Sequence, residues 1–454
     1  MKKFEQIMCT IGFALSASCG PSGSFTGPSP TPTPVPAPIP TPPPMPVPPA
    51  IIRLKAALLQ GQELQTQPLA LDAKTLTNQS FYPDNAVTVI DHGDPRLRWL
   101  GGRFAIGTNY PFTSARNGQA VTFGDVRLLN GAGLPNFRLG INNGVEFTLP
   151  AGQTEFEFVL IDSGPALPVS ILVDSKKTNS DGYVVDVQAS GNFKYTRIVL
   201  PSSNSPRKIT LNFGWRPFIG LRLPQGQSIG PIPVHSAEAT VVFIGDSITE
   251  GAVSSFPDRS WPMQAAYRLG ISNPIVSGAG GTGYLARRPA SPTQAGYNFR
   301  ERLVDATEAK NGSSDPAVFV GTAPDAIVVA GGINDCAASV GALYTPDQTA
   351  TEALAYFQAI RAAAPQTVIF VLGPFTDWNN PTYSASSTAC RDAIFEAARQ
   401  VPLTYTIDVS TWVNNANRDQ VFNGNVYGPH PVDTGHYIYG QRAAEGIAAI
   451  LNSL

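Results

Sequence analysis

The stretch Ala239-Thr-Val-Val-Phe-Ile-Gly-Asp-Ser247 decides the fold of this chain. Its apolar run, Ala239 to Ile244, ends at a glycine, an aspartate and a serine. A short apolar run bounded by turn residues indicates a strand buried on both faces, as in parallel sheets. Ligands of such sheets bind beyond the carboxyl ends of the strands, so we expect chemistry at or near Ser247.

Strands and helices alternate after this stretch. We expect further strands at Pro274–Val276, Ala326–Ala330, Thr367–Leu372 and Leu403–Ile407, and helices at Pro262–Leu269, Thr349–Ala363, Ala385–Gln400 and Thr434–Leu451. This alternation indicates βαβ units, and therefore a parallel sheet covered by helices on both faces. Residues 239–454 are thus predicted to form an α/β domain.

Residues 51–235 have a different texture. Short alternating apolar runs are bounded by Gly, Asn and Pro, at Ala86–Ile90, Gln119–Phe123, Val145–Leu149, Phe156–Leu160, Ser170–Asp174, Gly182–Val187, Tyr195–Leu200 and Lys208–Asn212. Such spacing is typical of an antiparallel sandwich. We predict an all-β, jelly-roll-like sandwich for this region, with no helical stretch inside it.

The first 19 residues have the order of a secretion signal. Lys2 and Lys3 precede an apolar run from Ile7 to Ala17, which is too short to span a bilayer as a helix. The residues before Cys19 resemble a bacterial lipobox, although Ser16 stands where such boxes usually carry Leu. We therefore expect an exported cell-envelope protein, anchored to a membrane through a lipidated Cys19 or, alternatively, simply secreted.

Residues 20–50 are rich in proline, which supplies 14 of the 30 residues from Pro21 to Ala50. Proline fixes φ and removes backbone donors, so this segment is predicted to be a disordered or polyproline II linker. Neither a helix nor a sheet interior suits it. Its expected role is spacing between Cys19 and the body of the protein.

Composition excludes several function classes. Charged residues make up 14% of the chain and the formal net charge is −2, which argues against nucleic acid as a partner. No His, Cys or Asp cluster has metal-ligand spacing, so neither a metal nor another cofactor is expected. Outside the signal only Cys336 and Cys390 remain, and the sequence leaves open whether they form a disulfide or stay free thiols.

Four loops that follow the predicted strands carry reactive or amide side chains. They are Gly245-Asp246-Ser247, the glycine-rich run from Gly278 to Gly283, Gly332-Ile-Asn334-Asp335, and the loop that holds His430 and His436. A serine on a strand-to-helix turn can act as a nucleophile, and glycine-rich backbone can offer donors to an oxyanion. Two of only four histidines, His92, His235, His430 and His436, lie in the last loop, where a general base is needed.

These four blocks, in this order, resemble the SGNH (GDSL) hydrolase family over residues 239–454. The resemblance implies a three-layer αβα sandwich, with Ser247 as nucleophile and His430, which is followed by Pro431, as general base. It also implies an oxyanion hole made by the N–H of Ser247, a glycine N–H and the Asn334 side chain. Gly281 fits that glycine best by spacing, and Gly280 is close behind.

The sequence departs from the family pattern at one point. The family usually carries Asp three residues before the catalytic His, and Tyr427 occupies that position here. A literal D-x-x-H occurs later, as Asp433 to His436, which makes His436 the alternative base. The resemblance therefore extends to the subset with a Ser-His dyad, in which another group orients the ring.

The remaining candidates for that orienting role are Asp408, Asp433 and a main-chain carbonyl. Asp246 is a further acidic residue beside Ser247, although a helix N-cap would account for it equally well. The sequence does not choose among these groups.

A β-sandwich in front of an SGNH domain resembles the two-domain carbohydrate esterases of the acetyl-xylan and acetyl-mannan type. Trp99 and Trp215 are then sandwich core, or one of them lines a sugar platform. The expected function is a serine esterase that hydrolyses O-acyl, chiefly O-acetyl, esters of an acetylated polysaccharide. The alternatives are a surface glycan-binding lipoprotein without turnover, and a lipase-like esterase or acyltransferase that acts on longer acyl chains.

Overall fold

The computed structural model describes residues 47–454 except 66, 68, 92–93, 101–103, 108–119, 124–143, 162–168, 179–192, 214–217, 236, 288–297, 301–322, 338–342 and 425. The expected signal with Cys19, the proline-rich segment, His92, Trp215 and the strand expected at Gly182–Val187 lie outside the described residues. Within the described part of the chain, no helix has the length and apolarity needed to cross a bilayer.

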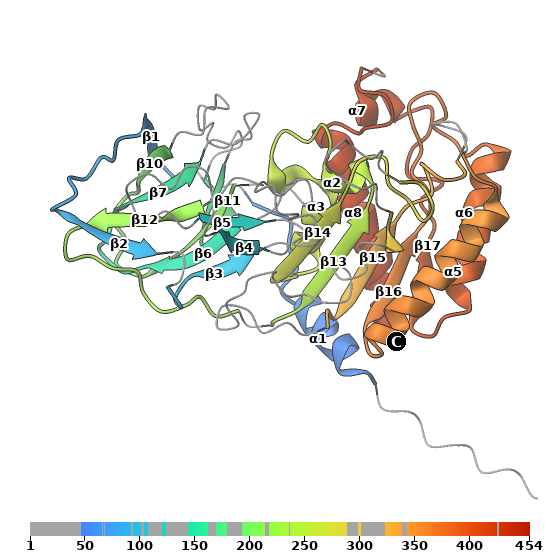
Figure 1. Cartoon of the computed structure of the whole chain (residues 1–454), viewed down its shortest axis with the longest axis horizontal. Coiled ribbons are helices and arrows are strands. Elements are labelled where there is room, and N and C mark those ends of the chain that lie inside the picture. The colour runs from blue at the N-terminus through green and yellow to red at the C-terminus, as the bar shows by residue number, and fades with distance from the viewer. Residues whose placement is uncertain are drawn as a thin grey trace, which may run out of the picture. The chain divides into compact units, whose positions relative to one another are not determined.

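A parallel sheet forms the centre of the C-terminal half. Its strand order is β14 (Asn273–Gly278), β13 (Thr240–Gly245), β15 (Ala326–Ala330), β16 (Val368–Leu372) and β17 (Thr404–Ile407). All four pairings are parallel. The predicted α/β fold class is thus confirmed, and the stretch that opened the analysis is β13 (Figure 1).

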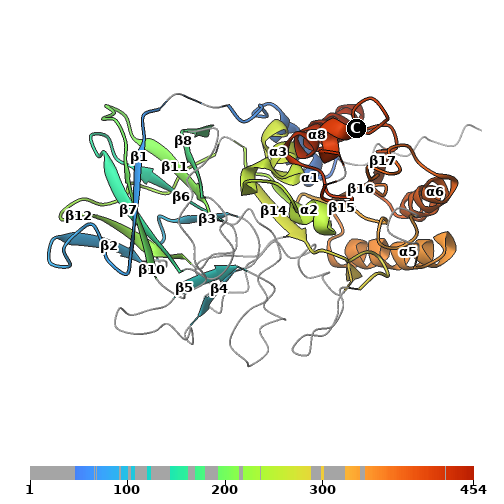
Figure 2. The same ribbon diagram turned by 90° about the horizontal axis from the view of Figure 1, so that it is seen from above.

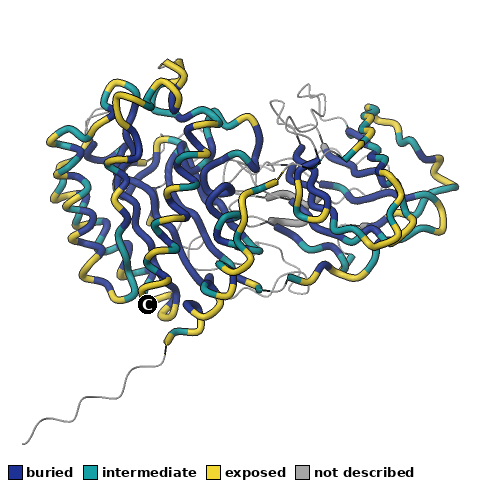
Figure 3. The backbone as a smooth tube through the Cα atoms, turned by 180° about the vertical axis from the view of Figure 1, so that it is seen from behind, coloured by how far each residue is buried: buried dark blue, intermediate teal, exposed yellow. Residues whose placement is uncertain are grey.

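Helices cover both faces of this sheet because the side chains of β13 alternate. Val241 and Phe243 join one hydrophobic core, and Val242 and Ile244 join another. The first core contains α1 (Pro49–Leu58), α3 (Trp261–Arg268) and α8 (Asp433–Ser453), and the second contains α5 (Pro346–Ala363) and α6 (Ala385–Arg399). Figure 2 shows these two helix layers on opposite sides of the strands, and most of the residues of β13, β15 and β16 are buried (Figure 3).

Local sequence signals fix where these helices begin and how closely they pack. Thr345 and Gln348 form a capping box at the start of α5. Each side chain accepts a hydrogen bond from the backbone N–H of the other residue, a donor that the helix leaves unpaired. Gly440 lets α8 approach α3, because a Cβ at this position would lie 2.4 Å from Cβ of Gln264. The layers are therefore specified by caps and by a small residue, as well as by apolar patterning.

The N-terminal half contains two antiparallel sheets. The first has the order β1 (Asp72–Thr77), β10 (Phe193–Val199), β7 (Glu155–Ile161), β12 (Phe218–Pro224), β5 (Ala120–Phe123) and β4 (Phe104–Gly107), with β2 (Val87–Asp91) also paired to β12. The second has the order β3 (Arg98–Leu100), β6 (Gly144–Leu149), β11 (Arg207–Asn212), β8 (Ser170–Val173) and β9 (Lys176–Lys177). The expected β-rich region is confirmed.

The two antiparallel sheets share one core. Phe147 of β6 meets Phe156 of β7 edge to face, with ring centroids 5.2 Å apart. Trp99 of β3 meets Phe218 of β12 in the same way at 5.4 Å, and only 3% of Trp99 is exposed. Trp99 is therefore a core residue that offers no face to solvent, so it does not line a sugar platform.

The structure differs from the sequence-based expectation at the start of the body. Residues 49–58 form a helix, α1, where only strands were expected after residue 51. Its buried positions, Ala50, Ile51, Leu54 and Ala57, lie on one helical face and join the core of the α/β half. Arg53 also pairs with Asp325, at 2.6 Å, beside the first residue of β15. The helix packs on the α/β half because its single apolar stripe is covered there.

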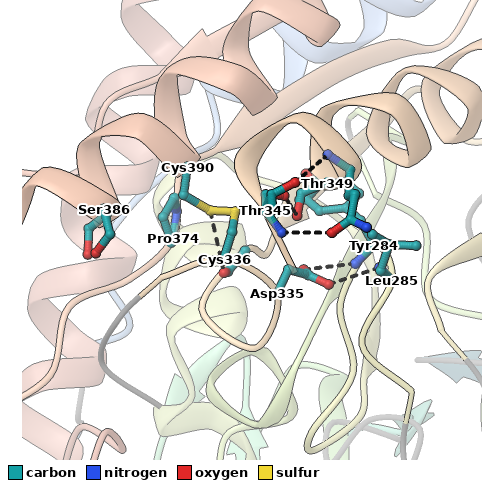
Figure 4. The surroundings of a disulfide bond; sticks show 12 residues. Tyr284, Leu285, Asp335, Cys336, Thr345, Thr349, Pro374, Ser386 and Cys390 are labelled. Carbon is teal, nitrogen blue, oxygen red and sulfur yellow. Dashed lines mark hydrogen bonds between the residues drawn. A yellow bond between two sulfur atoms is a disulfide. The ribbon is translucent and has the colours of Figure 1, made fainter. Parts of the chain in front are cut away.

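A disulfide joins Cys336, in the loop after β15, to Cys390 of α6 (Figure 4). Their Cα atoms are 5.5 Å apart, and both residues are buried. The structure therefore contains the bonded form of the two alternatives that the sequence left open. The bond attaches the Gly332–Asp335 loop to a helix that packs beneath it.

We expect the double substitution Cys336→Ala/Cys390→Ala to lower the free energy of unfolding by about 2–4 kcal/mol, because the bond restricts the unfolded chain. The sequence separation of 54 residues makes the closed loop a long one. Urea unfolding of both proteins measures the difference. Dithiothreitol should destabilise the wild type and leave the variant unchanged, and a variant as stable as the wild type would contradict the expectation.

Candidate active site

Strand register brings the candidate loops to one edge of the parallel sheet. Gly245, the last residue of β13, is aligned with Gly278 at the end of β14 and with Ala330 at the end of β15. The loops that continue from these three residues carry Ser247, the glycine-rich run and Asn334. Figure 1 shows α2 (Ser247–Glu250) at this edge, at the opposite end of the sheet from α1.

Ser247 begins α2, directly after a tight turn. Asp246 caps this short helix by accepting a hydrogen bond of 2.9 Å from the N–H of Ile248, and it is 1% exposed. The turn requires glycine at Gly245, because a Cβ there would lie 2.6 Å from the carbonyl oxygen of Ala330. Asp246 is thus a buried cap that fixes the backbone around the serine.

His430 lies beside Ser247. Its Nε2 is 2.8 Å from Oγ of Ser247, and its Nδ1 is 3.0 Å from the carbonyl oxygen of Tyr427. A carbonyl only accepts, so Nδ1 carries the proton and donates to Tyr427. Nε2 is then free to accept the hydroxyl proton of Ser247. This is the arrangement of a nucleophile, a base and a group that orients the base.

The backbone of Tyr427 occupies the position that the missing family aspartate would have. Tyr427 lies three residues before His430, and its main-chain carbonyl, rather than a side chain, holds the ring. The left-handed backbone of Gly428, with φ of 64°, lies within this turn. Of the orienting groups that the sequence left open, the structure places a main-chain carbonyl against His430.

The two other carboxylates have different partners. Asp408 pairs with Arg391 at 2.9 Å and accepts from the N–H of Ser410. Asp433 accepts from the N–H and Oγ of Ser255 and from Arg259. Burial alone would raise the pKa of Asp433, but these hydrogen bonds outweigh it and lower that pKa.

The two candidate glycine donors to the oxyanion, Gly280 and Gly281, differ in whether their N–H groups are already hydrogen-bonded. The N–H of Gly280 donates to Oε2 of Glu250 at 2.8 Å, so it is already committed. The N–H of Gly281 has no partner among the described residues, and, apart from Gly281 and its two chain neighbours, no described atom lies within 4 Å of the place where its Cβ would be. Of the two, Gly281 is therefore the donor that remains available to a reacting group.

Asn334 and its neighbour Asp335 tie the third loop to the second. Nδ2 of Asn334 donates to the carbonyl of Thr282 at 3.0 Å, which leaves its second amide hydrogen for a ligand. Asp335 is 0% exposed and accepts from the backbone N–H groups of Tyr284, Leu285 and Ala286 (Figure 4). Burial raises the pKa of Asp335, and the three donors oppose that rise.

Sequence reasoning assigned no role to Glu250 or Asp335. Both act on the glycine-rich loop, Glu250 through Gly280 and Asp335 through the turn that follows. The only available signal was position, since Asp335 directly follows Asn334 and Glu250 follows Ser247 by three residues.

His436 lies in the core and does not reach Ser247. Its Nε2 donates to the carbonyl of Ala252 at 3.0 Å, and its Nδ1 accepts from the N–H of Trp261 at 3.3 Å. Both bonds require the neutral ring, and burial lowers the pKa of His436 to about 4. His436 thus holds α8 against the loop after α2 and against the start of α3.

The remaining described histidine, His235, belongs to a different cluster. Its Nε2 lies 2.8 Å from Oε2 of Glu146. Burial would raise the pKa of Glu146, but His235, Lys208 and Arg98 together lower it. Among the described residues, no group of three or more His, Cys, Asp or Glu side chains could hold a metal ion.

The α/β half of the chain matches a known family of acyl hydrolases. Residues 243–438 match the model of the GDSL-like Lipase/Acylhydrolase family, so this part of the chain is a domain of that family. The match includes Ser247, the glycine-rich loop, Asn334 and His430. Among curated proteins, none matches the sequence.

Several solved structures share the fold of a larger part of the chain. A family two carbohydrate esterase from Cellvibrio japonicus is 14% identical and has a TM-score of 0.55, over 84% of this chain and 99% of that one. One from Clostridium thermocellum, in complex with cellohexaose, is 17% identical with a TM-score of 0.54, over 79% and 100%.

A salicylyl-acyltransferase from a tetracycline biosynthetic pathway is 15% identical, with a TM-score of 0.58 over 81% of this chain and 98% of that one. Each of these three structures covers a larger share of this chain than the α/β half makes up. The likeness in fold therefore extends into the N-terminal half.

We expect the stability of the protein to fall as pH decreases from about 6.5 to about 4, in part through His436. The unfolded ring binds a proton near its ordinary pKa of 6.5, whereas the folded ring does so only near 4. Between these values the unfolded state holds more protons, which costs the folded state about 3 kcal/mol in total. Urea unfolding at pH 7 and at pH 4.5 measures the loss.

The variant His436→Gln removes this titration, so its loss between the two pH values should be smaller than that of the wild type. Carboxylates that titrate in the same range act on both proteins and cancel in the comparison. Equal losses in the two proteins would show that His436 is not the group responsible.

Proposed function

We propose that this chain is a serine esterase that hydrolyses O-acyl esters of polysaccharide, chiefly O-acetyl esters. The observation that carries the proposal is the hydrogen-bonded series from Ser247 through His430 to the carbonyl of Tyr427. A serine hydroxyl is a weak nucleophile until a neighbouring base accepts its proton. The proposal is supported by Nε2 of His430, which lies 2.8 Å from Oγ of Ser247, and by the Tyr427 carbonyl, which holds the proton on Nδ1.

In the proposed reaction, Oγ of Ser247 attacks the ester carbonyl while Nε2 of His430 takes its proton. The N–H groups of Ser247 and Gly281 and the amide of Asn334 stabilise the oxyanion, and each such donor is worth about 10²–10³ in turnover. His430 then gives the proton to the departing sugar hydroxyl. A water molecule, activated by the same ring, releases the acid and restores the serine.

The choice of polysaccharide rests on likeness in fold. Structures of family two carbohydrate esterases share the fold over about four fifths of this chain, and one of them is a complex with cellohexaose. The likeness to a salicylyl-acyltransferase makes acyl transfer the second candidate. In that reaction an alcohol replaces water in the second step.

We expect Ser247→Ala and His430→Ala each to lower kcat on 4-nitrophenyl acetate by at least about 10³-fold, because each removes one member of the dyad. Two matched controls should keep kcat within about threefold. Ser254→Ala removes a nearby serine whose hydroxyl donates to the carbonyl of Gly251, and Tyr427→Ala removes a side chain while the carbonyl remains. Activity in Ser247→Ala would refute the proposed nucleophile.

The substrate class is tested with the same protein. We expect 4-nitrophenyl esters to be hydrolysed fastest at the two-carbon acyl chain, with kcat/KM falling steadily to ten carbons, and acetate to be released from acetylated xylan or mannan. Faster turnover of long chains would identify a lipase-like enzyme. An acetylated alcohol formed in place of free acetate would identify a transferase, and glycan binding without turnover would identify a binding protein.

A further inference from the structure

The segment from Ser255 to Arg259 connects two structural regions. It includes the short 3₁₀ helix η2 (Pro257–Arg259) and precedes α3. Its single carboxylate, Asp258, is bound by the β-sandwich, and two of its other residues bind the first residue of α8. Because α8 begins just after the loop that carries His430, this segment lies between the sandwich and the candidate general base.

The sandwich holds the segment through Asp258, which is 0% exposed. Nζ of Lys177, in β9, lies 2.7 Å from Oδ2 of Asp258, and Oγ of Ser170, in β8, donates to Oδ1 at 2.6 Å. The side chain of Lys177 is itself only 7% exposed. A buried carboxylate needs such partners, since leaving it unpaired away from water is costly. The contact therefore combines an ion pair from Lys177 with a hydrogen bond from Ser170 on one buried carboxylate.

The next residues carry the contact to α8. Arg259 donates to Oδ2 of Asp433 at 2.5 Å, and Ser255 donates to both carboxylate oxygens, through its N–H at 2.8 Å and its Oγ at 2.6 Å. The ring of Phe256 lies beside two cations. Its centroid is 4.8 Å from Nζ of Lys177 and 4.6 Å from the guanidinium of Arg259. Both cations thus contact the same ring.

Asp433 lies where it can fix the position of the backbone close to His430. It is the first residue of α8 and lies three residues after His430, and Pro431 restricts the backbone between them. A shift at Asp433 is therefore passed on to the ring that must stay 2.8 Å from Ser247. Misplacement of a catalytic group by about 1 Å is enough to lower turnover by about 10²-fold.

We propose that Lys177 and Ser170 of the β-sandwich are positioning residues for His430, acting through Asp258, Arg259 and Asp433. The inference rests on the proposed function, because it assigns the sandwich a part in the same site. It also gives a role to Asp433, which the D-x-x-H pattern singled out and which orients the start of α8 rather than the imidazole.

The first test compares Lys177→Met with Lys176→Met in the full chain. Methionine keeps the apolar stem of Lys177 and removes its charge, and Lys176 is an exposed neighbour in β9 that forms no ion pair among the described residues. On 4-nitrophenyl acetate we expect Lys177→Met to lower kcat about 10- to 100-fold with KM within about threefold. Lys176→Met should match the wild type.

A double-mutant cycle with Asp433→Asn tests the pathway. If both residues act on His430 through the same segment, adding Asp433→Asn to Lys177→Met should lower kcat much less than it does in the wild type. Independent, multiplicative losses would overturn the proposal. So would a Lys177→Met protein whose melting temperature falls while its kcat, measured well below that temperature, is unchanged, since the contact would then be only an interface.

The second test does not depend on esterase activity. The chain has four histidines, so selective ¹⁵N labelling gives few imidazole signals, and His430→Ala assigns the one of interest. We expect Lys177→Met to shift the ring nitrogen signals of His430, and Lys176→Met to leave them in place. Unmoved signals would overturn the positioning role. If Lys177→Met shifts these signals and the wild-type protein hydrolyses no ester, the positioning role is retained and the proposed function is refuted.

Discussion

The parallel register of three strands is the constraint on which the rest of the site depends. Because Gly245, Gly278 and Ala330 are aligned across β13, β14 and β15, the loops after them start at one edge of the sheet. A slip of one strand by a residue would move its loop relative to the other two and would exchange the two faces of that strand. The alternation of Val241 and Val242 between two helix-covered cores holds that register in place.

Much of the site could be inferred from the chain because its side chains lie close to the ends of regular elements. Ser247 and Asn334 follow apolar strands, His430 precedes the last helix, and the structure places His430 within hydrogen-bond distance of Ser247. The group that orients the ring could not be inferred, since any residue at position 427 supplies a carbonyl. The commitment of the Gly280 N–H to Glu250 was equally hidden, because it depends on a turn geometry that sequence spacing does not encode.

The fold was predictable to the same degree and for related reasons. Strands of the α/β half were expected to within two residues of where they lie, because continuous apolar runs leave few alternatives. Helix α1 was missed because it follows a proline-rich segment, and its short apolar stripe, Ala50 to Ala57, gives a weak periodic signal. Its partners are distant in sequence, so tertiary packing decides its conformation.

The position of α1 has a consequence for the strand that carries the nucleophile. Arg53 pairs with Asp325, whose other oxygen accepts from the N–H of Thr240 at the first residue of β13. This contact lies at the amino edge of the sheet, the opposite edge from Ser247. The ion pair and the hydrogen bond thus couple the first helix of the body to the start of the strand whose far end leads to Ser247. Both ends of β13 are therefore held by contacts with residues that are distant in the sequence.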